Sequence, residues 1–224
     1  MWVPPGVCLW FAGKVIEMDE VEIDSGGASL PGEFTVPSDA AGISVFAHGS
    51  GSSRLSPRNL AVARALNERG IATLLFDLLS TEEAKNRENV FDIDLLSDRL
   101  EMATRWATAG PGSAGLPVGL FGASTGAAAA LVVAARLSTK VAALVSRGGR
   151  PDLAGPALER VPSPTLLIVG GHDPVVLELN RQALRMLRGE KRLDVIPGAG
   201  HLFEEPGALE RVGELAADWF LRHF

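Results

Sequence analysis

From residue 20 onward, short apolar runs alternate with segments whose apolar positions recur at helical spacing. Short apolar runs bounded by turn residues are typical of buried strands, and amphipathic stretches between them are typical of helices that cover a sheet. This alternation predicts a mostly parallel sheet of about eight strands with helices on both faces. The predicted strands are residues 21–24, 28–36, 43–47, 71–76, 118–121, 141–145, 165–169 and 193–196. The predicted helices are residues 57–69, 96–107, 125–137, 152–160, 175–188 and 207–222.

The first two predicted strands differ from the rest because only the turn Gly26-Gly27 separates them. Such a hairpin gives the sheet an antiparallel N-terminal edge. The longest irregular stretch, residues 77–92, is too short for a separate helical lid. We therefore expect one domain over residues 20–224 with an open site at the carboxyl edge of its sheet, and an N-terminal extension over residues 1–19.

Composition narrows the function classes. The 224 residues carry a formal net charge of −6, which disfavours nucleic acid as a partner because phosphate binding needs a basic surface. Cys8 is the one cysteine, so the chain can form neither an internal disulfide nor a multi-cysteine zinc site, and a cytoplasmic location is expected. Two prolines interrupt the apolar start, and Lys14 and Glu17 end it too early for a membrane span, so we expect none. Neither a metal nor an organic cofactor is implied, and a homo-oligomer is compatible with these features.

One motif indicates chemistry. Gly122-Ala123-Ser124-Thr125-Gly126 matches Gly-x-Ser-x-Gly and lies directly between a predicted strand and a predicted helix. A sharp turn at such a junction exposes the central serine and requires very small flanking residues, because the strand and helix backbones pass close to them. The position of the motif therefore predicts that Ser124 is a nucleophile.

A serine hydroxyl needs a base to take its proton and an acid to orient that base. Of the four histidines, His201 is the best base because it lies in a glycine-rich loop after the last predicted strand. Asp173 follows the strand at 165–169 and precedes Pro174, a position that suits a helix cap as well as a catalytic acid. Asp194 and Glu204 stay open as rival acids.

An oxyanion hole is the remaining requirement. The segment His48-Gly49-Ser50-Gly51 follows a predicted strand, and its glycines allow backbone N–H groups to turn toward the site. We expect the backbone N–H groups of Ser50 and Thr125 to be the donors. The segment 110–115 matches a dinucleotide-binding pattern, but it follows a helix and precedes a strand, so it is interpreted as a loop.

Four segments resemble a known family: FAHGSGSSRLSPRNLAVARALNERGIATLLFDLLS, GLFGASTGAAAAL, LLIVGGHDPVVLELN and GAGHLFEEPGAL. They resemble the dienelactone-hydrolase-like branch of the α/β-hydrolases, in particular small bacterial members that are sometimes joined to a phosphoribosyltransferase domain. The resemblance implies the α/β-hydrolase fold, and the same roles for Ser124, Asp173 and His201. True dienelactone hydrolases have a cysteine nucleophile where this chain has Ser124, which favours general ester hydrolysis over lactone hydrolysis.

The predicted function is hydrolysis of small, soluble, short-acyl carboxylic esters through an acyl-enzyme. A thioesterase, acyltransferase or peptidase could use the same triad, and a hydrolase-like binding protein without turnover is a further alternative. Arg147 and Arg150 follow the strand at 141–145 and could bind a substrate carboxylate, because a guanidinium matches that planar group. The alternative for both is a structural ion pair with an acid such as Asp152.

Overall fold

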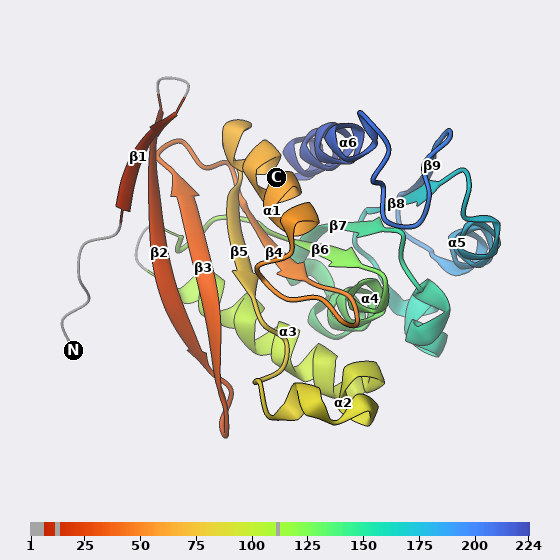
Figure 1. Cartoon of the computed structure of the whole chain (residues 1–224), viewed down its shortest axis with the longest axis horizontal. Helices are drawn as coiled ribbons and strands as arrows, with labels where there is room; N and C mark the ends of the chain where they lie inside the picture. Colours follow the sequence, from red (N-terminus) through yellow and green to blue (C-terminus); the bar gives the residue numbers. More distant parts are fainter. Residues whose placement is uncertain (1–6, 12–13, 111–112) are drawn as a thin grey trace.

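A computed structural model describes residues 7–11, 14–110 and 113–224. In this part of the chain nine strands form one sheet in the order β1-β2-β3-β5-β4-β6-β7-β8-β9 (Figure 1). Pairing is antiparallel from β1 to β5 along this order and parallel beyond β5, which confirms the predicted mostly parallel sheet with an antiparallel edge. The strands are β1 (Val7–Phe11), β2 (Lys14–Asp24), β3 (Ser29–Pro37), β4 (Ile43–Ala47), β5 (Ala72–Phe76), β6 (Val118–Ala123), β7 (Val141–Arg147), β8 (Thr165–Gly170) and β9 (Lys191–Ile196).

Helices cover both faces of the sheet, as predicted. Helices α1 (Pro57–Glu68) and α6 (Ala208–His223) pack on one face, whereas α3 (Ile93–Ala109) and α4 (Thr125–Leu137) pack on the other (Figure 1). The other helical segments are η1 (Glu83–Lys85), α2 (Arg87–Phe91), η2 (Ser138–Lys140), η3 (Pro151–Arg160) and α5 (Pro174–Met186).

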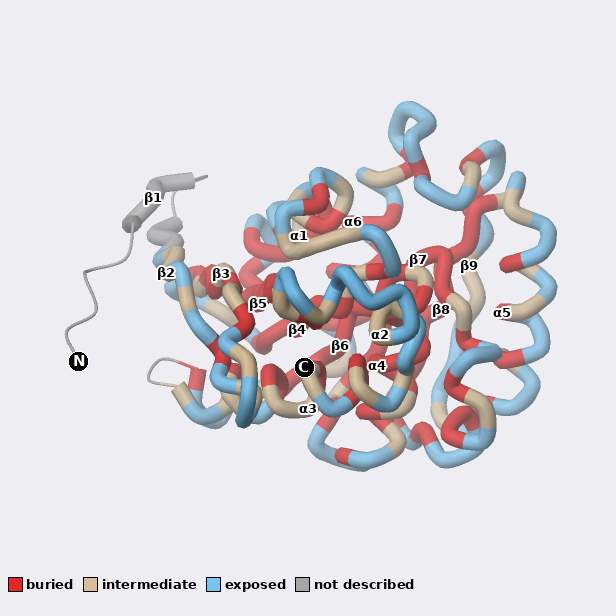
Figure 2. The backbone as a smooth tube through the Cα atoms, turned by 60° about the horizontal axis from the view of Figure 1, so that its bottom comes forward, coloured by how far each residue is buried: buried red, intermediate tan, exposed pale blue. Residues whose placement is uncertain are grey.

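The core consists of two apolar layers, one on each face of the sheet. Successive side chains of a strand point to opposite faces. Val45 and Leu120 therefore pack in the layer under α3 and α4, whereas their neighbours Phe46 and Phe121 stack on each other under α1 and α6. The central strands are buried on both sides, so the buried colour runs through the middle of the molecule in Figure 2.

The N-terminal edge extends further than predicted. The hairpin turn at Gly26 joins β2 to β3, as expected, but β2 already begins at Lys14 and pairs with β3 from Ile16 onward. The predicted boundary between residues 19 and 20 therefore falls inside β2. β1 pairs with β2 and forms the edge of the sheet. Residues 1–6 and 12–13 of the predicted extension lie outside the described residues.

Two connecting segments differ from the sequence prediction. The stretch at 77–92, predicted to be irregular, contains η1 and the five-residue helix α2, which Asn86 caps. The helix predicted at 152–160 is a 3-10 segment interrupted at Gly155, where φ is 50° and a proline follows. In the segment 110–115, residues 113–115 form a turn, and residues 111–112 lie outside the described part.

This topology gathers the predicted catalytic segments. The carboxyl ends of parallel strands share one edge of a sheet, where α/β proteins commonly bind ligands. The segments after β4, β5, β6, β8 and β9 all begin at that edge (Figure 1). The helices in the described ranges are all too short or too polar to cross a membrane.

Candidate active site

Ser124 occupies the turn between β6 and α4, with φ of 50° and ψ of −119°. Positive φ is uncommon for residues other than glycine, so the surrounding structure must hold this conformation. The N–H of Ser124 donates to the carbonyl of Arg147 at 3.2 Å, and its carbonyl accepts from the N–H of Arg150 at 3.0 Å. The backbone has the strained geometry of a nucleophile elbow.

Close approach to the preceding loop explains the small residues of the motif. A Cβ placed on Gly126 would overlap the carbonyl oxygens of Ala47 and His48, so no other residue fits there without displacing the loop after β4. A Cβ on Gly49 would lie 3.0 Å from the Cβ of Ser124. The loop predicted to supply an oxyanion donor therefore lies directly against the nucleophile.

The structure joins the predicted base to the predicted acid. Nδ1 of His201 lies 2.6 Å from Oδ2 of Asp173. In that arrangement Nδ1 donates its proton to the carboxylate, and Nε2 is left for proton transfer. The second oxygen, Oδ1, accepts the N–H of Val176 at 3.4 Å and caps α5. Asp173 thus caps α5 and also bonds the predicted base.

Local contacts place the imidazole of His201 beside the segment that follows β7. A Cβ on Gly148 would lie 3.6 Å from Cε1 of His201, and Gly148 directly follows Arg147, whose carbonyl binds Ser124. Among the described residues, no hydrogen bond joins Oγ of Ser124 to His201. Catalytic hydrogen bonds are often long in an enzyme without substrate and shorten when it binds.

The rival acids are held elsewhere. Asp194 pairs with Arg192 at 2.9 Å, and Glu204 pairs with Arg58 at 3.4 Å. The observed geometry therefore favours Asp173 as the acid.

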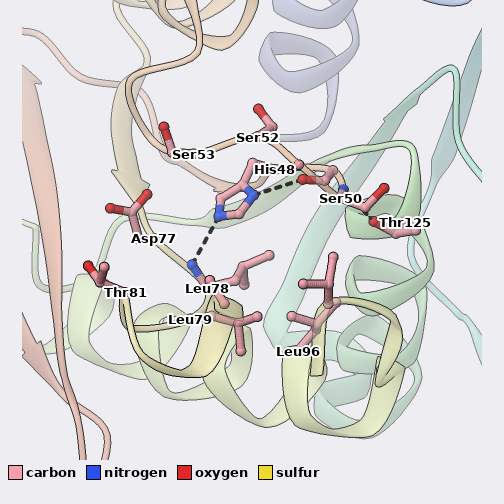
Figure 3. A pocket seen from close by; sticks show the side chains of 14 residues that line it. His48, Ser50, Ser52, Ser53, Asp77, Leu78, Leu79, Thr81, Leu96 and Thr125 are labelled. Atoms are coloured by element: carbon pink, nitrogen blue, oxygen red, sulfur yellow. Dashed lines mark hydrogen bonds between the residues drawn. The ribbon is translucent and has the colours of Figure 1, made fainter. Parts of the chain in front are cut away.

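The oxyanion loop differs from the prediction in one contact. The backbone N–H of Ser50, predicted to face the substrate, donates instead to Oγ1 of Thr125 at 2.9 Å (Figure 3). Sequence could not show this because it depends on the hydroxyl rotamer at the start of α4. The backbone N–H of Thr125 is at the first helical position, where a helix supplies no partner of its own. Both residues line the same cavity.

His48 is a residue that the sequence interpretation did not assign to the site. Its Nε2 accepts the N–H of Leu78 at 3.1 Å, so Nδ1 carries the proton and donates to the carbonyl of Gly49 at 3.0 Å (Figure 3). The imidazole fixes the peptide whose N–H belongs to Ser50. Burial lowers the pKa of His48 below 6.5, although Gly49 and Asp77 act in the opposite direction. The sequence signal that could have identified His48 is its position directly before Gly49 in the predicted oxyanion loop.

A cavity of about 300 Å³ opens beside this loop (Figure 3). The loops after β4 and β5 line it together with the start of α3, and its residues include Ser50 and Thr125. Small-molecule pockets typically range from about 300 to 1,000 Å³, so this one suits a small group.

The two arginines predicted to bind a carboxylate have other partners. Arg150 forms two hydrogen bonds with Asp152, at 2.7 and 2.9 Å. This is the ion pair that the sequence analysis gave as the alternative to substrate binding. Arg147 is buried and donates to Oδ1 of Asn59 at 3.2 Å, and burial, with Arg58 nearby, lowers its pKa to about 10. Neither arginine lines the cavity beside the oxyanion loop.

Comparison with known proteins agrees with this geometry. The sequence profile of the dienelactone hydrolase family matches residues 58–222. The chain belongs to this family. A dienelactone hydrolase from Anabaena variabilis is 52% identical, with a TM-score of 0.91 over 93% of this chain and 99% of that one. The family assignment and the α/β-hydrolase fold are thereby confirmed.

A more distant solved structure shares the fold, and a curated relative matches in sequence. Est1E from Butyrivibrio proteoclasticus is 18% identical, with a TM-score of 0.77 over 91% of this chain and 98% of Est1E. A Mycobacterium tuberculosis protein of strain H37Rv, which carries the provisional name phosphoribosyl transferase, is 59% identical over 92% of this chain and 46% of its own length. The chain thus spans about half the length of the curated relatives it matches.

Proposed function

We propose that this dienelactone hydrolase family member is a serine hydrolase that cleaves small, soluble carboxylic esters through an acyl-enzyme. The observation that carries the proposal is the coupling of Asp173 to His201 at 2.6 Å at the same sheet edge as the strained Ser124. The name of the mycobacterial relative refers to a protein about twice as long, and we assign the hydrolytic step to the part that this chain matches.

In the first half of the reaction, Oγ of Ser124 attacks the ester carbonyl carbon while Nε2 of His201 takes the hydroxyl proton. The carboxylate of Asp173 orients the ring and stabilises the imidazolium. The N–H groups of Thr125 and Ser50 bind the oxyanion, and for Ser50 this requires the hydroxyl of Thr125 to rotate away from it. The imidazolium then gives its proton to the leaving alkoxide.

In the second half, water attacks the acyl-enzyme. His201 takes a proton from the water and returns it to Oγ of Ser124 as the ester bond to the enzyme breaks. The products are one carboxylic acid and one alcohol, so atoms balance without a cofactor. The side chain of His201 is 40% exposed, which gives water and the leaving alcohol direct access.

A fluorophosphonate probe tests the nucleophile, because it forms a bond from Oγ to phosphorus with loss of fluoride. The wild type should be labelled, and Ser124→Ala should not. Ser138→Ala is a matched control because Ser138 is the other serine in the described residues with positive φ, at the far end of α4. Equal labelling of wild type and Ser124→Ala would refute the proposal.

A further inference from the structure

The nucleophile separates the site into two halves. β6, which carries Ser124 at its end, pairs with β4 on one side and with β7 on the other. Asp173 and His201 follow β8 and β9, beyond β7 (Figure 1). The cavity lies on the opposite side, because residues 48–53 follow β4 and residues 77–81 follow β5.

This arrangement defines which end of an ester each half receives. The leaving alkoxide must take its proton from His201, so the alcohol side of the substrate lies toward β8 and β9. The remaining substituent of the carbonyl carbon is then directed away from the imidazole, past the oxyanion donors. Ser50 and Thr125, the residues of those donors, line the cavity. We propose that this cavity is the acyl pocket, an inference that rests on the proposed function.

The lining indicates the chemistry of the acyl group. Its apolar part consists of Leu78, Leu79, Ala84, Val90 and Leu96. At a volume of about 30 Å³ per water-sized group, 300 Å³ accommodates about ten non-hydrogen atoms. The pocket therefore fits a medium-length or aromatic acyl group, which is larger than the short acyl group expected from the sequence.

Charge in the pocket excludes acidic acyl groups. Asp77 is the one charged residue among the described residues that line it, and Arg54 pairs with it at 2.6 Å. The backbone N–H of Arg54 binds the other oxygen of the same carboxylate at 2.7 Å, and Arg54 is not among the residues that line the cavity. A carboxylate on the acyl chain would meet the like charge of Asp77, with no lysine or arginine among the described residues of the lining. The selected class is therefore esters of uncharged, apolar acids.

Two substitutions of opposite size test the pocket. Ala84→Phe fills it from an exposed position, and Val90→Ala enlarges it. The substrates are p-nitrophenyl acetate, octanoate and benzoate, which share one leaving group. In wild type, kcat/KM should be at least about tenfold higher for octanoate than for acetate, since each buried methylene contributes about 0.8 kcal/mol.

The ratio of kcat/KM for octanoate to that for acetate should fall at least about tenfold in Ala84→Phe and should not fall in Val90→Ala. Val175→Trp is the control, because Val175 is 71% exposed on α5 and outside the pocket, and the ratio should stay at the wild-type value. A ratio that Ala84→Phe leaves unchanged would overturn the acyl-pocket assignment.

A charge comparison adds a second criterion. The p-nitrophenyl ester of butyrate should be hydrolysed at least about tenfold faster than the p-nitrophenyl monoester of succinate, because the latter brings a carboxylate beside Asp77. Equal rates would overturn the assignment. Failure of the proposed function is distinguishable, since it would abolish turnover of every ester together with probe labelling. If Ala84→Phe is labelled and hydrolyses acetate but keeps the wild-type ratio of kcat/KM for octanoate to acetate, only the acyl-pocket assignment is overturned.

Discussion

Replacement of His48 by leucine tests whether this imidazole positions the oxyanion loop. Leucine keeps an apolar side chain in place but removes both ring hydrogen bonds, to Gly49 and from Leu78. Leu78 is 1% exposed, so its unpaired N–H should cost about 1–3 kcal/mol. The lost bond to the Gly49 carbonyl adds about 1 kcal/mol. We expect a total loss of about 2–4 kcal/mol in the free energy of unfolding.

The catalytic effect should be larger than the effect on substrate binding. Without the imidazole, the peptide between Gly49 and Ser50 can rotate and withdraw its N–H from the oxyanion. Loss of one such donor typically lowers kcat by about 100-fold to 1,000-fold. The assays are urea unfolding and the separate kcat and KM for p-nitrophenyl acetate.

His223→Leu is the matched control. His223 is also a poorly exposed histidine, with 11% of its side chain accessible, but it lies at the end of α6 and meets Trp219 edge to face. Its replacement should affect stability and leave kcat near the wild-type value. If His48→Leu lost stability yet kept kcat within about threefold of wild type, His48 would be structural only and the positioning argument would be refuted.

Two further predictions concern the acid and the pH dependence. Asp173→Asn should lower kcat about 10,000-fold by stabilising the wrong imidazole tautomer, whereas Asp92→Asn, which alters the comparable cap of α3, should leave kcat unchanged. A drop below about tenfold would reopen the rival acids. Since the folded pKa of His48 lies below the unfolded value of 6.5, its contribution to stability is complete above that pH and is lost as the pH falls below it. The stability gap between wild type and His48→Leu should therefore narrow from pH 7.5 to pH 5 in urea titrations, and a constant gap would contradict the assigned neutral state.

Sequence alone predicted those parts of the molecule that local pattern determines. Continuous apolar runs predicted the central strands, and the required strand-to-helix context predicted the turn at Ser124. Asp173 and His201, which the structure joins by a hydrogen bond, were predicted to pair because each follows a strand at the shared edge. The contacts that the sequence did not reveal join distant residues. The hydrogen bond from the Ser50 N–H to Thr125 joins residues 75 positions apart, and the bond from Leu78 to His48 joins residues 30 positions apart.

The N-terminal hairpin and the segment at 77–92 were harder to predict for different reasons. β2, the second strand of the sheet, carries several charged residues, so its apolar pattern is weak and its start was placed too late. The helix α2 has only five residues and none of them is buried, so it leaves no apolar periodicity to detect. Both segments are stabilised by neighbours that a linear pattern does not reveal.

In the proposed mechanism, the residues that transfer protons and the residues that line the acyl pocket come from different segments of the chain, on opposite sides of β6. The proton-transfer pair comes from the last third of the polypeptide, and the cavity comes largely from the segments before α4. Exchange of residues between β5 and α3 could therefore retune which acids the protein accepts while the acid and base stay intact. Substitutions in this segment would change the accepted acyl group and leave the proton-transfer pair in place.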